Sequence, residues 1–333
     1  MISRRAFTQG LVASSIAAAH AVRAEDSYPG KPVRLVVGLA PGGIADQTAR
    51  IIQARLGEVL GQTVIVENRT GAGGAIATRM VAAAPADGYT LLVAFDGTHV
   101  TIPAANPAIG FDPLRDFAPI AKVVDSPVLI TAHNSFPAHD FGEFIPLARK
   151  ALGSGKGPYD YGTAGVGSTG HLTMEMLKLQ LNFHAVHIPY RGGGDARAQV
   201  LGRQIPLMLA AVPTTSADIR AGTLKGLAVT SAHRTPALPD VPALSELPYP
   251  DLKGLDVNSW VGLVAPAKTP APIVARLDAA LREVLASEDI RKRLLNSGST
   301  PVPSSPDSFA AQIAADFGRW KRVIADSKLR LEA

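Results

Sequence analysis

An apolar run, a glycine turn and a helix follow one another repeatedly along this chain, and this order limits the folds open to it. The first copy begins with residues 32–39, which are almost continuously apolar, as expected of a parallel strand buried on both faces. The motif Pro41-Gly42-Gly43 follows, and apolar residues then recur at helical spacing as far as Gly61, which is typical of a left-handed helix cap. Because alternating strands and helices build parallel sheets, the pattern predicts an α/β fold.

The length and the second copy of the pattern predict two lobes. A chain of 333 residues is too long for one ordinary core. A Pro- and Gly-rich passage without clear periodicity precedes a second series of strands and helices, and a Pro-rich return follows it. Both halves share the same strand, glycine turn and helix, which indicates two similar lobes facing a cleft. We predict one lobe from residues 25–125 with 255–333, and the other from 126–254.

Each remaining element has its own local pattern. Two helices that begin at Pro270 and Pro306 have no strands of their own to cover, so we expect them to pack on the first lobe. The other predicted strands cover 63–66, 90–94, 128–131, 159–162, 184–189, 205–210, 224–230 and 260–265, and the other predicted helices cover 73–84, 140–152, 168–181, 193–201 and 214–221.

Composition excludes several classes of function. Apolar residues make up 47% of the chain and charged residues 18%, which permits a large core and argues against disorder. The formal charge is +5, but Arg4, Arg5 and Arg23 lie in the N-terminal segment, so the rest is close to neutral and does not indicate a nucleic-acid surface. The absence of cysteine excludes disulfides, cysteine-ligated metals, thiol catalysis and a lipoprotein anchor.

The first 24 residues have the order of a secretory signal. The pair Arg4-Arg5 precedes an uncharged run over 6–22, and Val22-Arg23-Ala24 has small or branched residues at the −3 and −1 positions of a cleavage site. We predict cleavage after Ala24 and a periplasmic location. The arginine pair resembles a twin-arginine signal, with the general secretory route as the alternative. An amphipathic first helix is the competing structural interpretation. No later stretch reaches about 18 uninterrupted apolar residues, so no membrane span is predicted.

Two glycine-rich turns link a strand to a helix, one in each predicted lobe. The first covers residues 41–46 and the second 161–172. Glycine lets a ligand approach the backbone, and free N–H groups at a helix start favour an anion, so the pair predicts a small-anion site between the lobes. The alternative is that each glycine only relieves a tight connection. Asp46 either contacts the ligand or caps its own helix. Thr98, after a strand, either reaches the cleft or belongs to a plain turn.

A third strand-to-helix turn carries a phenol and a guanidinium. It runs from Pro189 to Gly194 and includes Tyr190 and Arg191. Arg191 is suited to bidentate contact with a distal carboxylate of a ligand, and the alternative is that it braces the lobe interface. Trp260, at the predicted return to the first lobe, is interpreted as a hinge or core residue rather than as a stacking platform.

Two enzyme hypotheses compete with the binding site. Residues 165–170 fit the dinucleotide motif G-x-G-x-x-G, and Arg191 about twenty residues further on would favour a phosphorylated ribose, so an NADP-dependent oxidoreductase is the alternative function. Ser168 beside His171 suggests a nucleophile and a base. The glycine that a nucleophile elbow requires two residues before its serine is missing, however, which argues against a hydrolase.

The eight histidines do not predict a metal site. His184 and His187 are three residues apart on a predicted strand and therefore point to opposite faces, and no H-E-x-x-H motif occurs. We expect the histidines to be scattered packing or surface residues. The sequence predicts no metal, no cofactor and no catalytic residue.

Short motifs occur in a fixed order over nearly the whole chain that follows the signal. They are Pro41-Gly42-Gly43-x-x-Asp46, Val66-Glu67-Asn68-Arg69-x-Gly71-Ala72-Gly73-Gly74, Pro85-Ala86-Asp87-Gly88-Tyr89, Asp112-Pro113-x-x-Asp116-Phe117, Tyr161-Gly162-Thr163-Ala164-Gly165-x-Gly167-Ser168, His187-Ile188-Pro189-Tyr190-Arg191-Gly192 and Ser259-Trp260-x-Gly262. On these motifs the chain resembles the Bug family of periplasmic solute receptors, the extracytoplasmic components of tripartite tricarboxylate transporters.

The resemblance implies a two-lobed periplasmic-binding-protein fold of the Venus-flytrap kind, type II-like, in which each lobe is a doubly wound, mainly parallel sheet with flanking helices. It implies a monomeric, non-catalytic receptor for a small carboxylate, such as a di- or tricarboxylate, an amino acid or an aromatic acid. Its partners would be the membrane subunits of the transporter. A sensory periplasmic adaptor with the same site is the other non-enzyme alternative. Carried onto this sequence, the ligand-binding residues are Gly42, Gly43, Asp46, Thr98, Thr163, Ala164, Gly165, Ser168, Thr169, Tyr190, Arg191 and Gly192.

This chain departs from the family pattern beside the first glycine turn and in the second lobe. Leu39-Ala40 precedes the first turn where the family usually has an aromatic residue or proline. Pro206 and Ala210 replace residues that are commonly acidic or polar. Both changes make the surroundings of the site less polar, so the sequence leaves open which acid is bound.

Overall fold

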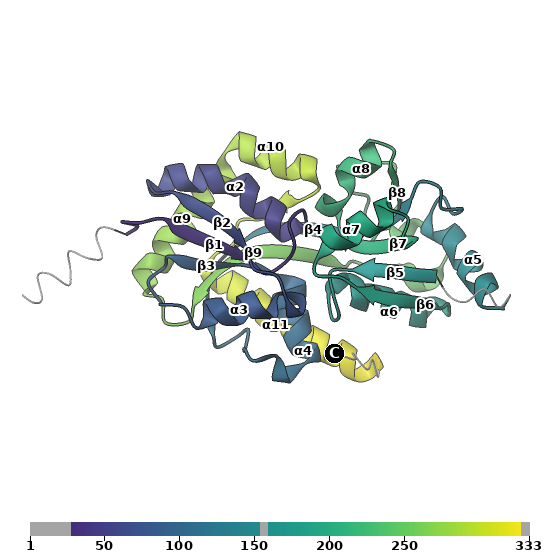
Figure 1. Cartoon of the computed structure of the whole chain (residues 1–333), viewed down its shortest axis with the longest axis horizontal. Helices are drawn as coiled ribbons and strands as arrows, with labels where there is room; N and C mark the ends of the chain where they lie inside the picture. The colour runs from purple at the N-terminus through teal and green to yellow at the C-terminus, as the bar shows by residue number, and fades with distance from the viewer. Residues whose placement is uncertain (1–27, 154–158, 328–333) are drawn as a thin grey trace, which may run out of the picture.

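The computed structural model describes residues 28–153 and 159–327, so the predicted signal at residues 1–24 lies outside the described residues. Two groups of strands and helices lie side by side along the long axis of the molecule (Figure 1). One long strand, β4 (Phe117–His133), belongs to both groups. We refer to the group that contains the described N-terminus as the first lobe and to the other group as the second lobe.

The first lobe is built on a sheet of five main strands and one short strand. Strands β1 (Val33–Val37), β2 (Val64–Asn68) and β3 (Thr90–Phe95) are parallel, and β9 (Asn258–Pro266) runs antiparallel between β3 and residues 117–127 of β4. Helices and turns cover this sheet: α2 (Ile44–Leu60), η1 (Ala72–Gly74), α3 (Ala75–Ala82), the π-helical turn η2 (Gly97–Thr101), α4 (Ile102–Ala105), η3 (Pro107–Ile109), α9 (Ala271–Ala286), α10 (Glu288–Ser297) and α11 (Pro306–Ser327). The short strand β10 (Thr300–Pro301) also pairs with β4.

The second lobe repeats the plan with fewer strands. Strand β5 (Tyr159–Thr163) lies parallel between β6 (Ala185–Pro189) and β7 (Leu207–Ala211). Residues 128–133 of β4 pair antiparallel with β7 and with β8 (Leu224–Val229). The helices and turns are α5 (Phe141–Gly153), α6 (Thr169–Leu181), α7 (Gly193–Leu201), η4 (Val212–Thr214), α8 (Ser216–Arg220), η5 (Leu244–Glu246) and η6 (Pro250–Leu252).

The strand patterns have the burial that the sequence predicts. Leu35 and Val37 of β1 face the core under α2, whereas Val36 faces a second core on the opposite side of the sheet. Both faces of β1 are therefore covered, which explains why the sequence shows a continuous apolar run there instead of alternation. Gly61 ends α2 with φ +70° and ψ +19°, as the left-handed cap predicted.

Parallel pairing is confined to the outer strands of each lobe. Where the chain passes between the lobes, β9 pairs antiparallel with β3 and β4, and β7 pairs antiparallel with β4. The two lobes therefore share a central antiparallel region and carry parallel βα units on either side. The predicted boundaries near residues 125 and 255 stay a prediction.

Two elements differ from the sequence prediction. Strand β4 has 17 residues, although only 128–131 were predicted as strand and the Pro- and Gly-rich passage over 96–119 was predicted as an ordered excursion or a crossover. Prolines at 119 and 127 interrupt the strand pattern, and the pairing register with β9 shifts just after Pro119. Helix α10 was not predicted, because Ser287 alone separates it from α9 and, of its ten residues, only Ile290 and Leu294 are buried.

The late helices pack on the first lobe, as expected from their lack of nearby strands. Leu277, Leu281 and Val284 of α9 lie in the core under α2, and Phe309 of α11 lies in the core on the other face of the sheet. Within residues 28–153 and 159–327, none of the helices combines the length and apolar character that a membrane span needs.

Candidate functional site

The two predicted glycine turns meet at the junction of the lobes. Gly43 and Ile44 from the start of α2, and Ala164 and Ser168 from the turn before α6, line one cavity with a free volume of about 20 Å³, which is enough for about one water molecule. Its other walls are apolar or carry hydroxyl groups: Leu39, Phe95, Val128, Gly170, Gly193, Leu209, Ala210, Ala211, Thr214 and Ser259. Two helix starts therefore face the same enclosed space.

A wider groove of about 420 Å³ adjoins the same second-lobe turn. Ala72, Gly73, Ile102, Ala105, Asn106 and Ile109 line it from the first lobe, and Gly165, Val166, Gly167, Pro189, Tyr190 and Arg191 line it from the second. Most of these side chains are apolar. The turn over residues 164–168 therefore borders a small inner cavity through some residues and an apolar outer groove through others.

Hydrogen bonds join the lobes directly around these spaces. The Ala40 N–H donates to the Arg191 carbonyl oxygen at 3.2 Å, and the Gln47 side-chain amide donates to the Pro213 carbonyl oxygen at 2.8 Å. Glycine makes this close approach possible, because a methyl group on Gly194 would lie 2.0 Å from the Pro41 carbonyl oxygen. The junction is therefore packed backbone against backbone.

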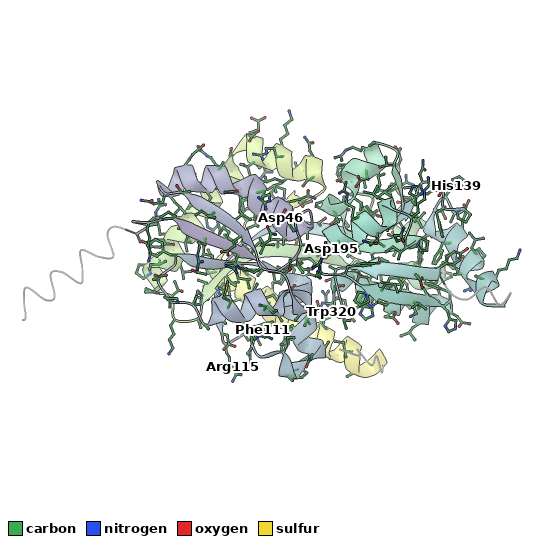
Figure 2. All side chains as sticks on the ribbon, viewed as in Figure 1. Asp46, Phe111, Arg115, His139, Asp195 and Trp320 are labelled. Carbon is green, nitrogen blue, oxygen red and sulfur yellow. The ribbon has the colours of Figure 1, made fainter. Side chains whose placement is uncertain are left out.

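Asp46 holds the first turn in place. Its carboxylate accepts hydrogen bonds from the Gly42 N–H and from the Asn68 side chain, both at 3.0 Å, and pairs with Arg50 at 2.9 Å. Gly42 has φ +86°, a conformation that favours glycine. Figure 2 labels Asp46 near the middle of the molecule, where the lobes meet. In this geometry the carboxylate is engaged within the first lobe, with the Gly42 N–H, Asn68 and Arg50.

The Thr163 hydroxyl organises the second turn. Its Oγ1 accepts from the Gly165 N–H at 3.2 Å and from the Ser168 hydroxyl at 3.1 Å, and lies 2.7 Å from Nε2 of His187. Ser168 in turn accepts from the His171 N–H at 3.4 Å and so caps α6. The two hydroxyl groups and a ring nitrogen thus fix the backbone of the turn that borders both spaces.

A stacked histidine pair supports this turn, and the sequence did not predict it. The rings of His171 and His187 lie 3.8 Å apart and nearly parallel, and Nδ1 of His171 accepts from the Gly167 N–H at 3.1 Å. Burial lowers the pKa of His171 to about 4 and that of His187 to about 3, so both rings are neutral at pH 7. The residues are 16 apart on different elements, so spacing alone gives no signal for the pair.

The remaining predicted residues take different places. Thr98 is buried in η2 and donates to the Gly73 carbonyl oxygen at 2.9 Å, and Thr169 donates to Asp96 across the lobe junction at 2.5 Å. The Arg191 side chain is 76% exposed and pairs with Asp195 at 3.0 Å. Gly192 lies against Ala40 of the first lobe, whose nitrogen would be 2.8 Å from an added methyl group.

The geometry around Ser168 does not form a nucleophile and base. Its hydroxyl group donates to Thr163, and the contact with His171 is made by the backbone N–H of that residue. Among the described residues, no cluster of three or more His, Asp or Glu side chains is arranged to hold a metal ion.

His99 lies beside Thr98 in η2 and is fully buried among aromatic rings. Its ring packs edge-on against Phe117 with centroids 4.8 Å apart, and neither ring nitrogen has a hydrogen-bond partner in the part of the chain that the structure describes. Burial lowers the pKa of His99 to about 4. The folded state therefore holds this imidazole neutral over a pH range in which the unfolded chain, with a pKa near 6.5, protonates it.

A His99→Leu variant is expected to resist acid better than the wild type. The stabilising effect of the lowered pKa is present above pH 6.5 and is lost as the pH falls toward 4, at up to about 1.4 kcal/mol per pH unit. Urea unfolding at pH 7, 6 and 5 should show a smaller loss of unfolding free energy for the variant. The exposed His184→Leu serves as the matched control, with the wild-type slope. Equal slopes for His99→Leu and the wild type would contradict the prediction.

The fold consists of two α/β lobes that share strand β4, and the starts of two helices face one enclosed space between the lobes. This arrangement is that of a two-lobed solute-binding protein. Residues 48–329 match the family model described as the tripartite tricarboxylate transporter family receptor, and the chain belongs to this family. The resemblance to the Bug family is confirmed by the solved structure of the periplasmic binding protein BugD. BugD is 34% identical to this chain, with a TM-score of 0.83, and the match covers 90% of this chain and 99% of BugD.

Two other solved structures carry ligands. MatC from Rhodopseudomonas palustris, with bound malate, is 34% identical with a TM-score of 0.82, over 89% of this chain and 100% of that chain. Rpa4515 from R. palustris, with adipate, is 31% identical with a TM-score of 0.84, over 91% of this chain and 99% of that chain. The predicted fold class is confirmed. The family does not favour the oxidoreductase alternative.

Proposed function

We propose that this protein is a periplasmic receptor for a small carboxylate, held at the lobe junction between the starts of α2 and α6. The observation that supports this most is the shared cavity, because Gly43 and Ile44 on one side and Ala164 and Ser168 on the other line it together. N–H groups in the first turn of a helix lack partners within the helix and carry a partial positive charge, so each turn is suited to a carboxylate group.

The proposed contacts divide by role. The backbone N–H group of Gly43 donates to the ligand, while Asp46 and Thr163 hold the two turns in shape, Thr163 by accepting from the Gly165 N–H. The Tyr190 and Arg191 side chains border the outer groove and face the distal part of a longer ligand. The proposed ligand-binding set is Gly42, Gly43, Asp46, Thr98, Thr163, Ala164, Gly165, Ser168, Thr169, Tyr190, Arg191 and Gly192.

The shape of the site favours an acid with an apolar body. The inner cavity is small, and the adjoining groove is lined mostly by apolar side chains, among them Ile102, Ile109 and Val166. A carboxylate head at the helix starts would leave an aliphatic or aromatic body in the groove. Malate and adipate, which occupy the two solved relatives, are therefore the first acids to test.

The remaining proposals concern export and assembly. We propose that the chain is cleaved after Ala24, that the receptor is a non-catalytic monomer, and that it delivers its ligand to the membrane subunits of a tripartite tricarboxylate transporter. The family supports the last point through its description as the receptor of such a transporter.

A thermal-shift screen tests the ligand class. A small carboxylate at about 100 times its Kd adds about 2.7 kcal/mol to the stability of the folded protein, which at this chain length raises Tm by several degrees. We expect a selective shift with one of a set of mono-, di- and tricarboxylates and acidic amino acids. The matched controls are the neutral diamides of malate and adipate, for which no shift is expected. No shift with any acid, after unfolding and refolding to remove a co-purified ligand, would contradict the proposal.

A further inference from the structure

Asp96 lies where β3 ends, at the junction of the lobes, and its side chain is 3% exposed. Its Oδ2 accepts a hydrogen bond of 2.5 Å from the hydroxyl group of Thr169. Asp96 belongs to the first lobe, whereas Thr169 opens α6 in the second lobe. The other oxygen, Oδ1, is buried and has no partner at ordinary hydrogen-bond geometry among the described residues, although the backbone N–H groups of Gly97 and Trp260 lie close to the carboxyl group. A carboxyl group is therefore enclosed by the contact between the lobes, with the Thr169 hydroxyl group as its partner from the second lobe.

The surroundings disfavour a negative charge at this position. On α11, the carboxylate of Asp316 lies near Asp96, accepts from the Trp260 indole at 2.9 Å and pairs with Arg319 at 3.1 Å. The other titratable groups on the packed elements are engaged elsewhere or neutral: His99 on η2 is neutral, Lys122 pairs with Asp125 on β4, and His171 and Glu175 on α6 contact His187 and Tyr161. Among the described residues, no cation pairs with Asp96.

Burial, hydrogen bonds and the nearby carboxylate together shift the pKa of Asp96. Burial raises its pKa from 3.8 to about 7 and the nearby Asp316 carboxylate adds to this rise, whereas hydrogen bonds from the Thr169 side chain and from the Gly97 and Trp260 backbone lower it. Opening the lobes would withdraw Thr169 and admit water, which returns the carboxyl group toward its ordinary pKa. The closed and open arrangements therefore differ in their affinity for a proton at this one side chain.

We propose that Asp96 is a proton-binding latch: the lobes close with Asp96 protonated and open with Asp96 ionised. Closure then takes up a proton at neutral pH. Because the closed arrangement binds the proton more tightly, closure is favoured at low pH and weakened as the pH rises. A closed pKa of about 7 corresponds to about a tenfold fall in the ratio of closed to open molecules between pH 6 and pH 8. A retained ligand would be released more readily at the higher pH, a consequence that rests on the proposed function.

Distance measurements on the ligand-free protein test the latch. Because the chain contains no cysteine, two introduced cysteines take up spin labels at chosen positions alone. Ile76→Cys on α3 and Leu179→Cys on α6 are suitable, since these side chains are 50% and 61% exposed and belong to different lobes. Pulsed electron–electron double resonance measures the distance between the two labels. Repeated at several pH values between 5 and 9, it gives the fraction of molecules with the shorter distance, which are those with closed lobes.

Three variants of the spin-labelled protein distinguish the titration of Asp96 from the hydrogen bond of Thr169 as the cause of a pH-dependent closed population. Asp96→Asn is expected to show no change in the closed population with pH, because its side chain stays neutral. Thr169→Val removes the bond between the lobes and is expected to lower the closed population at every pH while keeping the pH response. Asp125→Asn is the matched control, a partly buried acid that pairs with Lys122 on its own strand, and a wild-type response is expected. A wild-type population that does not change between pH 6 and pH 8 overturns the proposal, and so does a wild-type pH response in Asp96→Asn.

A ligand arm keeps the latch and the proposed function apart. With malate or adipate as the probe, isothermal titration should show affinity that falls about tenfold between pH 6 and pH 8 in the wild type and stays constant in Asp96→Asn. If neither acid binds, the proposed ligand class is at fault, and the distance measurement, which needs no ligand, still decides the latch.

Discussion

Gly194→Ala is expected to lower the affinity of the protein for its ligand at least about 100-fold, equivalent to about 2.7 kcal/mol, while both lobes still fold. The added methyl group would lie 2.0 Å from the carbonyl oxygen of Pro41 in the facing lobe. Nonbonded atoms prefer separations of about 3.5–4.0 Å, so the lobes cannot reach the arrangement described here. Gly194 lies within α7, where alanine favours the helix over glycine by about 1 kcal/mol.

Isothermal titration with an acid identified by the thermal-shift screen measures the loss, and circular dichroism checks the fold. Gly318→Ala is the matched control, because it lies in α11 and its methyl group would meet Arg322 Nη1 at an ordinary 3.7 Å. Wild-type affinity in Gly194→Ala would show that ligand binding does not require the close approach of α7 to the first turn.

Trp260→Ala is expected to reduce the free energy of unfolding by about 4 kcal/mol, the usual scale for removing a fully buried large aromatic side chain. Trp260 is 1% exposed, its ring meets Phe309 edge-on at 5.1 Å, and its Nε1 donates to Asp316 at 2.9 Å. The truncation leaves a cavity beside Phe309 and removes one of the donors that Asp316 uses. Trp260→Phe keeps part of the packing and should lose about half as much.

Guanidinium unfolding followed by far-ultraviolet circular dichroism is the appropriate measurement, because Trp260 is one of only two tryptophans and its removal would alter a fluorescence signal. A loss below about 1 kcal/mol in Trp260→Ala would argue against a core role. The result also bears on the sequence interpretation of this residue as part of a hinge or core.

The βα units could be predicted because their signals are local. The order of β1, the glycine turn and α2 follows from a continuous apolar run, from helical spacing and from Gly61, all within about thirty residues. The extent of β4 could not be predicted, since its partner β9 lies far along the chain and prolines at 119 and 127 interrupt the strand pattern. Pairing between distant segments, rather than propensity, decides that strand.

Part of the candidate site could likewise be predicted from local sequence signals, and part of it is shown only by the structure. The two glycine turns were predicted from sequence, and the structure brings them to one cavity through Gly43 and Ala164. For Asp46 the sequence left two roles open, and only the positions of Arg50 and Asn68 show which groups its carboxylate meets. The support of Thr163 by a histidine, and the contact of Asp96 with Thr169, join residues that no spacing rule relates.

The course of β4 and β9 has a consequence for how the lobes depend on each other. Pro127 of β4 lies opposite Asn258 of β9, so the chain leaves the first lobe and returns to it at neighbouring positions. The second lobe is thus an insertion of about 130 residues whose ends are already side by side. While that segment is unfolded, holding its ends together costs roughly 4 kcal/mol of loop entropy. Once the second lobe is folded, its ends are already held together, so the two distant halves of the first lobe meet without this loss of entropy. Each folded lobe therefore favours the folding of the other.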